Sequence, residues 1–314
     1  MYTSELEIED FLKEYRRSRV IIETTTRATL NRAVGFESKF GKPFYQFTTE
    51  EALEMYESVH AISVVSLQNN NLVLKHAARW FAYKYKKTIN NTYEEMTKDL
   101  LSTVIDIEKQ RSLILSREDI DNIQSNLLNA IDKAIVEMLF QGVGGEWLKE
   151  LTFMDASQVD KANLTIYFKT GKSISITSEI YDLLMEAFAE EELMSFGSTS
   201  RISRVTGRWL YKIRCNALSD NSDYNDEQSV ERRYRFIQRR LLLISKDLGV
   251  RLTSGGLQSS GLLWYLQRGV EDTGLEFREF VKTEQASQLA KRYDILSKEF
   301  YSQILVEKFE QYFI

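Results

Sequence analysis

Residues 164–177, L-T-I-Y-F-K-T-G-K-S-I-S-I-T, carry the one clear β signal in this chain of 314 residues. Apolar and polar residues alternate on both sides of a Thr-Gly pair, a pattern that predicts a β-hairpin. Two lysines, Lys169 and Lys172, stand at its expected tip. The stretch therefore predicts one short hairpin in a chain that is otherwise patterned as helices.

Helical periodicity dominates on both sides of the hairpin. Residues 5–17, 24–40 and 72–87 have apolar side chains close to helical spacing, and Thr48 with Glu51 forms a capping box that opens another helix. After the hairpin, the pattern predicts helices to the C-terminus with a loop at residues 219–227, and Thr253-Ser254 is expected to begin one of them.

A polar interval at residues 100–116 separates two blocks of predicted helices. We therefore expect a helical domain over residues 1–105 and a second domain over residues 116–314 that contains the hairpin. The length of the chain allows two domains. The predicted fold class is mainly α with a small β element.

The composition restricts the chemistry. A single cysteine, Cys215, and two histidines, His60 and His76, argue against a disulfide or a metal centre, and we expect no cofactor. The formal net charge of −5 requires any DNA contact to come from local basic patches. No stretch is apolar enough to span a membrane and the N-terminal sequence is too acidic for a signal peptide, so we expect a cytoplasmic protein.

The order of local features resembles the tyrosine recombinases, the phage-integrase family. Residues 134–160 resemble the segment in which that family carries T-G-x-R-x-x-E-L before a short strand, and the hairpin follows. The stretch T-S-G-G-L-Q-S-S-G, residues 253–261, resembles its H-x-L-R-H box. Residues 284–293 resemble its last box, where a His or Trp precedes the nucleophilic Tyr by nine positions. The resemblance implies an N-terminal helical, SAM-like core-binding domain and a C-terminal catalytic-like domain.

The sequence departs from this family at the residues that perform the chemistry. Gly144 stands at the first arginine, Gly255 at the histidine, Gln258 at the second arginine and Glu284 at the late His or Trp. Only a hairpin lysine (Lys169 or Lys172) and Tyr293 remain. Arginine pairs bidentately with phosphate, and losing one such preorganised donor removes about 3–4 kcal/mol of transition-state stabilisation. The resemblance therefore implies a scaffold that does not cut DNA.

Two other interpretations of Tyr293 stay open at the level of sequence. A tyrosine in K-R-Y-D on a helix usually packs its ring and exposes its hydroxyl. Alternatively, the chain is an active or partly active recombinase that cuts through Tyr293 with arginines from other positions, such as Arg251 or Arg268.

DNA binding depends on other residues, and three basic clusters are candidates for phosphate contact. They lie within residues 13–42, 75–87 and 201–214, and the last two windows contain no acidic residue. The candidates are Arg16, Arg17, Arg19, Arg27, Arg32, Lys75, Arg79, Lys84, Lys86, Lys87, Arg201, Arg204 and Arg208, with the hairpin lysines Lys169 and Lys172. The alternative for each cluster is a solvated helix face.

Residues 66–75, S-L-Q-N-N-N-L-V-L-K, are the candidate for reading bases. Ser66 would cap a helix whose exposed start carries Gln68, Asn69, Asn70 and Asn71, and such amides pair bidentately with adenine in the major groove. The alternative is a polar helix start that caps itself.

The degenerate G-V-G-G-E box and the stretch G-F-E-S-K-F-G-K-P-F, residues 35–44, resemble the phage lytic-cycle repressors of the MrpR type. This resemblance implies a sequence-specific transcriptional repressor that maintains lysogeny on operator DNA, near the nucleoid of a bacterial host. One implied partner is a second copy of the chain that exchanges the C-terminal helix of residues 296–314. This helix is equally suited to fold back on its own domain. A phage-encoded antagonist or co-regulator is another implied partner. A factor that binds only proteins is a third alternative.

Overall fold

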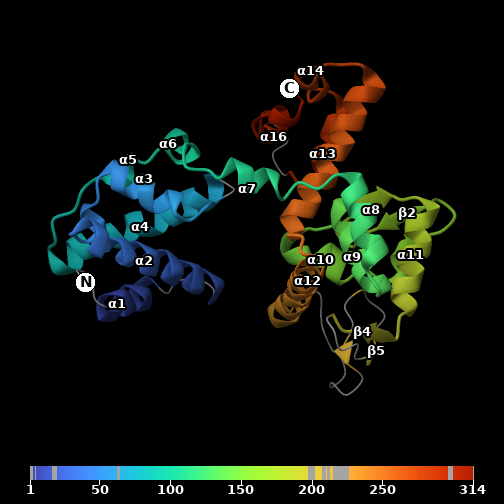
Figure 1. The fold of residues 1–314 in the computed structure, drawn as a ribbon, viewed down its shortest axis with the longest axis horizontal. Helices are drawn as coiled ribbons and strands as arrows, with labels where there is room; N and C mark the ends of the chain where they lie inside the picture. The colour runs from blue at the N-terminus through green and yellow to red at the C-terminus, as the bar shows by residue number, and fades with distance from the viewer. Residues whose placement is uncertain are drawn as a thin grey trace. The chain divides into compact units, whose positions relative to one another are not determined.

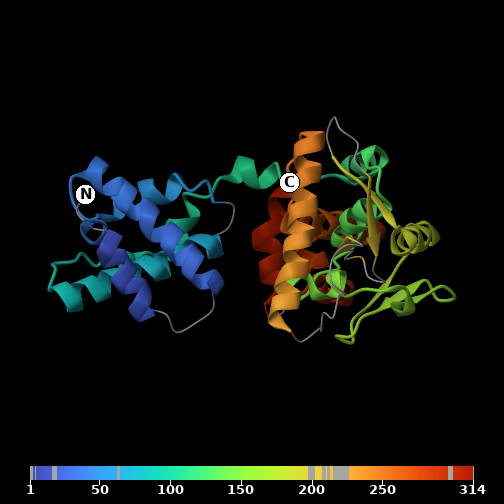
Figure 2. The ribbon, with the colours of Figure 1, turned by 90° about the horizontal axis from the view of Figure 1, so that it is seen from below.

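The computed structural model describes residues 3, 5–15, 20–61, 64–196, 202–206, 210, 213–214, 226–295 and 300–313; of residues 20–24, 110, 206 and 213–214 it describes the backbone alone. The chain divides into two compact units, Met1–Arg111 and Ser112–Ile314. This division lies inside the polar interval at residues 100–116. In the described residues, the first unit contains only helices, and all strands belong to the second (Figures 1 and 2).

The first unit surrounds one apolar core. Its helices are α1 (Glu5–Tyr15), α2 (Val20–Phe40), η1 (Phe44–Gln46), α3 (Thr49–Glu57), α4 (Val64–Tyr85), α5 (Thr92–Glu95), α6 (Lys98–Ser102) and α7 (Ile107–Arg111). Helix α4 contributes a buried face with Leu67, Leu74 and Phe81, which repeat at helical spacing. The predicted capping box at the start of α3 is confirmed, because Glu51 N–H donates to Thr48 Oγ1 and Thr48 N–H to the Glu51 carboxylate.

The second unit is mainly helical, as predicted, with two small antiparallel sheets. Its helices are α8 (Arg117–Asn126), α9 (Ala130–Phe140), η2 (Glu146–Leu148), α10 (Lys149–Thr152), η3 (Ala156–Gln158), α11 (Ser178–Ala189), α12 (Glu227–Leu248), α13 (Ser254–Thr273), α14 (Phe277–Phe280), α15 (Glu284–Arg292), α16 (Tyr301–Phe309) and η4 (Glu310–Tyr312). Helix α9 has ten of its eleven residues buried and packs against both α11 and α13. It is the central support of this unit.

The predicted hairpin is confirmed. Strands β2 (Thr165–Tyr167) and β3 (Ser173–Ser175) pair antiparallel, and the buried Ile166 and Ile174 face each other across the ladder. A third strand, β1 (Val159–Asp160), pairs with β2. Because side chains alternate across a strand, this register places one apolar row in the core and leaves the polar row outside.

The expectation of helices throughout the region after the hairpin is wrong. Strands β4 (Glu192–Met194), β5 (Ile202–Thr206) and β6 (Ile213–Arg214) form a second antiparallel sheet. These strands are two to five residues long, and they lack the alternation on both sides of a Thr-Gly pair that marks the first hairpin. Among the helices that the structure describes, none combines the length and apolar character needed to cross a membrane.

The C-terminal helix packs within its own unit. Leu305 and Phe309 of α16 are buried in a cluster with Phe280, and the rings of Phe277 and Phe313 stack with centroids 4.0 Å apart. The described part of the C-terminal segment therefore packs its apolar side chains against α13 and α14 of the same chain. Exchange of this helix between protomers stays a proposal.

Candidate functional site

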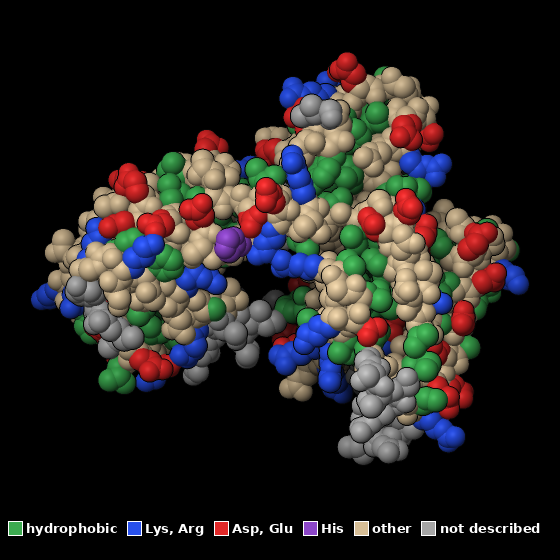
Figure 3. Space-filling view, in the orientation of Figure 1, with side chains coloured by type: hydrophobic (Ala, Val, Ile, Leu, Met, Phe, Trp, Pro, Cys, Tyr) green, Lys and Arg blue, Asp and Glu red, His purple; other side chains and the backbone are tan. Residues whose placement is uncertain are grey.

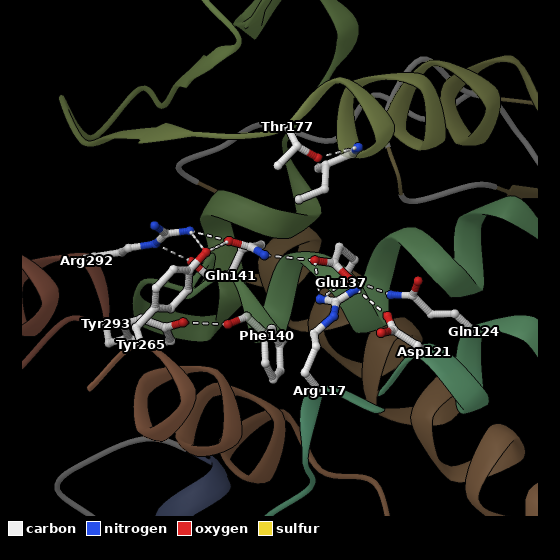
Figure 4. A network of polar contacts seen from close by, with 11 residues as sticks. Arg117, Asp121, Gln124, Glu137, Phe140, Gln141, Thr177, Tyr265, Arg292 and Tyr293 are labelled. Atoms are coloured by element: carbon white, nitrogen blue, oxygen red, sulfur yellow. Dashed lines mark hydrogen bonds and ion pairs between the residues drawn. The ribbon is translucent and has the colours of Figure 1, made fainter. Parts of the chain in front are cut away.

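Tyr293 follows the last residue of α15, and its side chain is enclosed. The hydroxyl donates a hydrogen bond of 2.5 Å to the backbone carbonyl of Phe140, and the residue is 9% exposed (Figure 4). Burial raises the pKa of the Tyr293 phenol well above its ordinary value, although nearby Arg292 lowers it in part. The expectation that the ring packs is met, whereas the expectation of an exposed hydroxyl is wrong. In this position the oxygen is a hydrogen-bond donor to the backbone rather than an available nucleophile.

Two glycines create the space for this tyrosine. A Cβ atom at Gly261 of α13 would lie 1.7 Å from the Phe140 carbonyl oxygen and 2.6 Å from Tyr293 Oη. At Gly142, where φ is +84°, a Cβ atom would lie 3.0 Å from the Tyr293 ring. Helices α9 and α13 therefore approach so closely at this point that only glycine fits at position 261.

The arginines near Tyr293 bind other groups. Arg292 donates to the backbone carbonyl of Gln141 at 2.8 Å and also to its side-chain oxygen, while its guanidinium lies 4.5 Å from the Tyr265 ring centroid. Arg117 donates to both oxygens of the buried Glu137 at 2.8 and 2.9 Å (Figure 4). These guanidinium groups therefore serve an internal polar network around α9.

The arginines of the active-recombinase alternative lie elsewhere. Arg251 is exposed just before α13, and Arg268 is exposed with its guanidinium 5.0 Å from the Trp264 ring centroid. Within the described residues, no guanidinium group hydrogen-bonds to the Tyr293 hydroxyl, whose one bond is to the Phe140 carbonyl. Among the side chains that the structure describes, guanidinium groups therefore do not converge on Tyr293 in the way that phosphate cleavage by a tyrosine requires.

Two positions that match the family's arginines do meet in space. Gln258 donates from Nε2 to the backbone carbonyl of Val143 at 3.4 Å. A Cβ atom at Gly144 would lie 2.3 Å from the same Nε2 atom. The segment before η2 and the first turns of α13 are thus neighbours in the folded chain. Neither position contributes a charge.

Lys172 completes this cluster, but two carboxylates enclose its ammonium. The side chain is 13% exposed, and Nζ lies 3.0 Å from Glu150, 3.1 Å from Asp294 and 3.0 Å from the Gly142 carbonyl oxygen. Glu150 also accepts from the Gly144 N–H at 3.2 Å, and Asp294 from the Gly145 N–H at 2.9 Å.

The three charges in this Lys172 cluster sum to −1, so it repels a phosphate instead of binding one. The expectation that Lys172 contacts DNA is therefore wrong for this conformation. Lys169 remains exposed at the hairpin tip.

The other two positions of the family pattern stand apart from the Lys172 cluster. Gly255 is exposed in the first turn of α13, and a Cβ atom there would meet nothing within 4 Å. Glu284 is exposed at the start of α15, with its carboxylate 4.0 Å from Lys291 Nζ. The predicted helix entry at Thr253 is confirmed, because its hydroxyl accepts from the Gly256 N–H at 2.9 Å.

Several predicted DNA-contacting cations are paired with acids that are distant in the sequence. Lys75 and Arg79 both bind Glu94, Lys84 binds Glu14, and Arg27 binds Glu9. A stretch of sequence that contains no acidic residue can therefore still form part of a surface that does, because folding brings carboxylates from other helices next to its cations. Exposed ion pairs of this kind are individually weak, and each carboxylate offsets part of the positive charge that its partner offers to a phosphate.

The remaining basic candidates differ in exposure. Lys86 and Lys87 are exposed beyond the end of α4 and form no ion pair with a described residue, whereas Arg32 is half-buried. Arg204 on β5 is exposed and lies 3.9 Å from Glu192. Five candidates lie outside the described residues, namely Arg16, Arg17, Arg19, Arg201 and Arg208.

The amide cluster on α4 is divided between the surface and the core. Helix α4 begins at Val64, so Ser66 lies inside it and does not cap it. Gln68 and Asn69 are exposed as predicted, but Asn70 is 8% exposed and its side-chain oxygen accepts from the Thr29 hydroxyl at 3.0 Å. Asn71 is equally buried, so the expectation that Asn70 and Asn71 lie exposed for reading bases is wrong.

The structure also presents a basic surface that sequence reasoning missed. The run E-R-R-Y-R-F-I-Q-R-R, residues 231–240 of α12, contains five arginines. Arg232, Arg235 and Arg239 are exposed and repeat at helical spacing; we call them the α12 arginine row. Arg235 pairs with Glu231 of the same helix, whereas Arg239 has no ion pair with a described residue. Lys and Arg side chains gather over α12 (Figure 3).

The two other arginines of α12 explain why the row is one-sided. Arg233 is 1% exposed and donates to the backbone carbonyl of Thr152 at 2.7 Å. Arg240 is buried and pairs with Asp132, which is fully buried in α9. The density of arginines together with their spacing of three and four residues was the sequence signal for this surface.

Among the described residues, no cluster of His, Cys, Asp and Glu suits a metal ion.

Comparisons with known proteins place this arrangement in a family. The chain is 24% identical over 191 residues to the "SPbeta prophage-derived uncharacterized protein YopR" of Bacillus subtilis (strain 168), a match that covers 57% of this chain and 58% of that relative. The chain thus spans little more than half the length of this curated relative. Residues 114–313, well over half of the chain and nearly all of the second unit, match the family described as "MrpR, C-terminal catalytic domain". The chain therefore belongs to the MrpR family and carries its integrase-like, mainly helical domain.

Proposed function

We propose that this protein is a sequence-specific DNA-binding repressor of phage lytic genes, built on a tyrosine-recombinase fold that has lost strand cleavage. Its ligand is operator DNA in the cytoplasm of a bacterial host, at the nucleoid. Membership of the MrpR family and the similarity to a prophage-derived protein support the phage context. A second copy and a phage-encoded antagonist or co-regulator are the proposed protein partners.

The observation that carries the proposal is the contrast between two surfaces of the second unit. The exposed α12 arginine row offers guanidinium groups to solvent. The Lys172 cluster, by contrast, has its one cation held between two carboxylates. Guanidinium groups on one helix face suit the phosphates that flank a DNA groove. DNA contact and cleavage thus require different residues, and this chain has kept only the first set.

Loss of cleavage has a physical basis in the position of Tyr293. A buried phenol that donates to a carbonyl has to break that bond and lose its proton before it attacks phosphorus, and no described base is bonded to it. Each missing charge donor at the phosphate removes about 3–4 kcal/mol of transition-state stabilisation. With glycine and glutamine at the two arginine positions, the barrier rises too far for turnover.

The proposal is tested by titrating the protein against duplexes from its own phage promoters and against scrambled duplexes, at several salt concentrations. We expect preferential binding to a promoter segment and a steep loss of affinity as salt rises, because phosphate contacts release counterions. Equal affinity for promoter and scrambled DNA would overturn the repressor proposal.

The description of the matching family as a catalytic domain keeps one alternative in view, namely an enzyme that cuts and rejoins DNA through Tyr293. This alternative requires Tyr293 to leave its slot and arginines to approach it. A covalent adduct between Tyr293 and a nicked duplex would establish it.

A further inference from the structure

Helix α4 carries an exposed face of mixed chemistry in its first half. Val65, Gln68, Asn69 and Leu72 are spaced by three and four residues, so their side chains lie on one side of the helix. All four are exposed, with Val65 at 62% and Leu72 at 48%. The opposite side, with Leu67 and Leu74, is fully buried in the core of the first unit. We call these four residues the α4 face.

Within the described part of the first unit, no contact covers Val65 and Leu72, the two aliphatic side chains on either side of the amides Gln68 and Asn69. Asn70 and Asn71, which adjoin them in the sequence, are used internally: Asn71 accepts from the Tyr56 hydroxyl at 3.0 Å and donates to the Tyr93 carbonyl at 2.9 Å. The helix thus separates structural amides from solvent-facing ones. Gln68 and Asn69 remain for a partner.

The charge around the α4 face suits a polyanion. Helix α4 contains no aspartate or glutamate over its 22 residues, and two of its cations, Lys75 and Arg79, share the single carboxylate of Glu94. Lys86 and Lys87 follow its C-terminal end and are exposed without an ion pair to a described residue. A straight helix of this length spans about 33 Å, so one end reaches base edges while the other lies along the phosphates of the same groove.

We propose that the α4 face reads A·T base pairs in the major groove, with Gln68 and Asn69 on adenine and with Leu72 and Val65 against the thymine methyl groups. An adenine presents N7 and N6–H₂ to a side-chain amide, and its partner thymine presents the C5 methyl group beside them. A face that alternates amides with aliphatic groups matches both halves of the pair. This assignment rests on the proposed DNA-binding function and adds which base pair the first unit selects.

The thymine methyl group allows a direct test. Once a bound promoter segment is known, each of its thymines is replaced in turn by deoxyuridine, which removes the methyl group and leaves base pairing intact. We expect about fourfold weaker binding at the contacted thymines, the equivalent of one buried methyl group. In the Leu72→Ala variant, replacing the thymine that Leu72 contacts by deoxyuridine should not weaken DNA binding any further.

Leu6→Ala is the matched control, because Leu6 is 79% exposed on α1, outside the α4 face. This variant keeps the full sensitivity to deoxyuridine. The inference is overturned if no thymine in the segment is sensitive, or if Leu72→Ala and Val65→Ala both retain the sensitivity of the unmodified protein. Failure of the unmodified protein to bind any duplex would overturn the proposed function itself and this inference with it, so the two failures are distinguished.

Discussion

At the scale of single residues, the site around Tyr293 is a matter of space and charge. Gly261 removes the one Cβ atom that would collide with the Phe140 carbonyl, and the Tyr293 hydroxyl then satisfies that carbonyl. The sequence shows a lone tyrosine after a helix, but it does not show that a glycine 32 residues earlier makes a slot for it. Nor does local pattern reveal that Lys172 meets Asp294, which is 122 residues away. These features exist only in the folded chain.

Tyr293→Phe tests the structural role of the hydroxyl. The substitution leaves the buried Phe140 carbonyl without this donor, so we expect the free energy of unfolding to fall by about 1–3 kcal/mol. Promoter binding at a temperature where the variant is folded should be unchanged. Urea denaturation measures the first quantity and titration with DNA the second; unchanged stability with lost binding would contradict this assignment.

Gly261→Ala and Gly255→Ala form a matched pair in one helix. At position 261 the new methyl group overlaps the Phe140 carbonyl, and overpacking of this kind destabilises by about 1–3 kcal/mol or more. At position 255 the methyl group meets nothing, and alanine instead of glycine in a helix stabilises by about 0.5–1 kcal/mol. Thermal denaturation of both variants compares them, and an equal effect at the two positions would show that the slot is absent.

At the scale of secondary-structure elements, local patterns predicted what local interactions determine. The hairpin, the α3 capping box and the start of α13 all depend on residues within a few positions of each other, and all three were found. The short strands β4, β5 and β6 also pair with near neighbours in the sequence, but no alternation around a turn pair like that of residues 164–177 marks them, and they were missed. Helix α12 combines a local and a long-range feature. Its arginines can be read from the sequence, but which of them are buried and which are exposed follows from packing.

Adjacent arginines on α12 should separate binding from stability. In Arg239→Gln we expect the fold to be unaffected and the slope of log affinity against log salt to shrink by about 0.9, the contribution of one phosphate contact. In Arg240→Gln the buried Asp132 loses its partner, and the free energy of unfolding falls by about 3–5 kcal/mol. Salt-dependent DNA titration and denaturation measure the two effects; an unchanged salt slope in Arg239→Gln would remove the α12 arginine row from the interface.

At the scale of the whole molecule, an acidic chain is proposed to bind an acidic polymer. The net charge of −5 argues against general attraction, so we propose that affinity comes from local surfaces, among them the α12 arginine row, the α4 face and the cations beyond α4. Two units that each hold part of the interface gain affinity by acting on one duplex. The mainly helical fold was predicted from the sequence, and the division between the units lies inside the predicted polar interval, whereas the pairing of Lys75, Arg79 and Lys84 with carboxylates of other helices required the folded chain.

Separated units should therefore bind more weakly than the intact chain. We expect residues 1–111 and residues 112–314, each prepared as a fragment, to show affinities for the promoter segment at least tenfold below that of the full chain, because linkage raises the effective concentration of the second contact. Fluorescence anisotropy with labelled duplex measures all three. Full affinity in either fragment alone would contradict a shared interface.

The central claim is that this member of the MrpR family binds DNA without cutting it. One sample tests both the binding and the absence of cleavage. The protein is mixed with a nicked duplex that carries its promoter segment, and the mixture is run on a native gel and on a denaturing gel. We predict a retarded complex on the native gel and only free protein and intact strands on the denaturing gel. A protein–DNA adduct that survives denaturation and disappears in Tyr293→Phe would contradict the account.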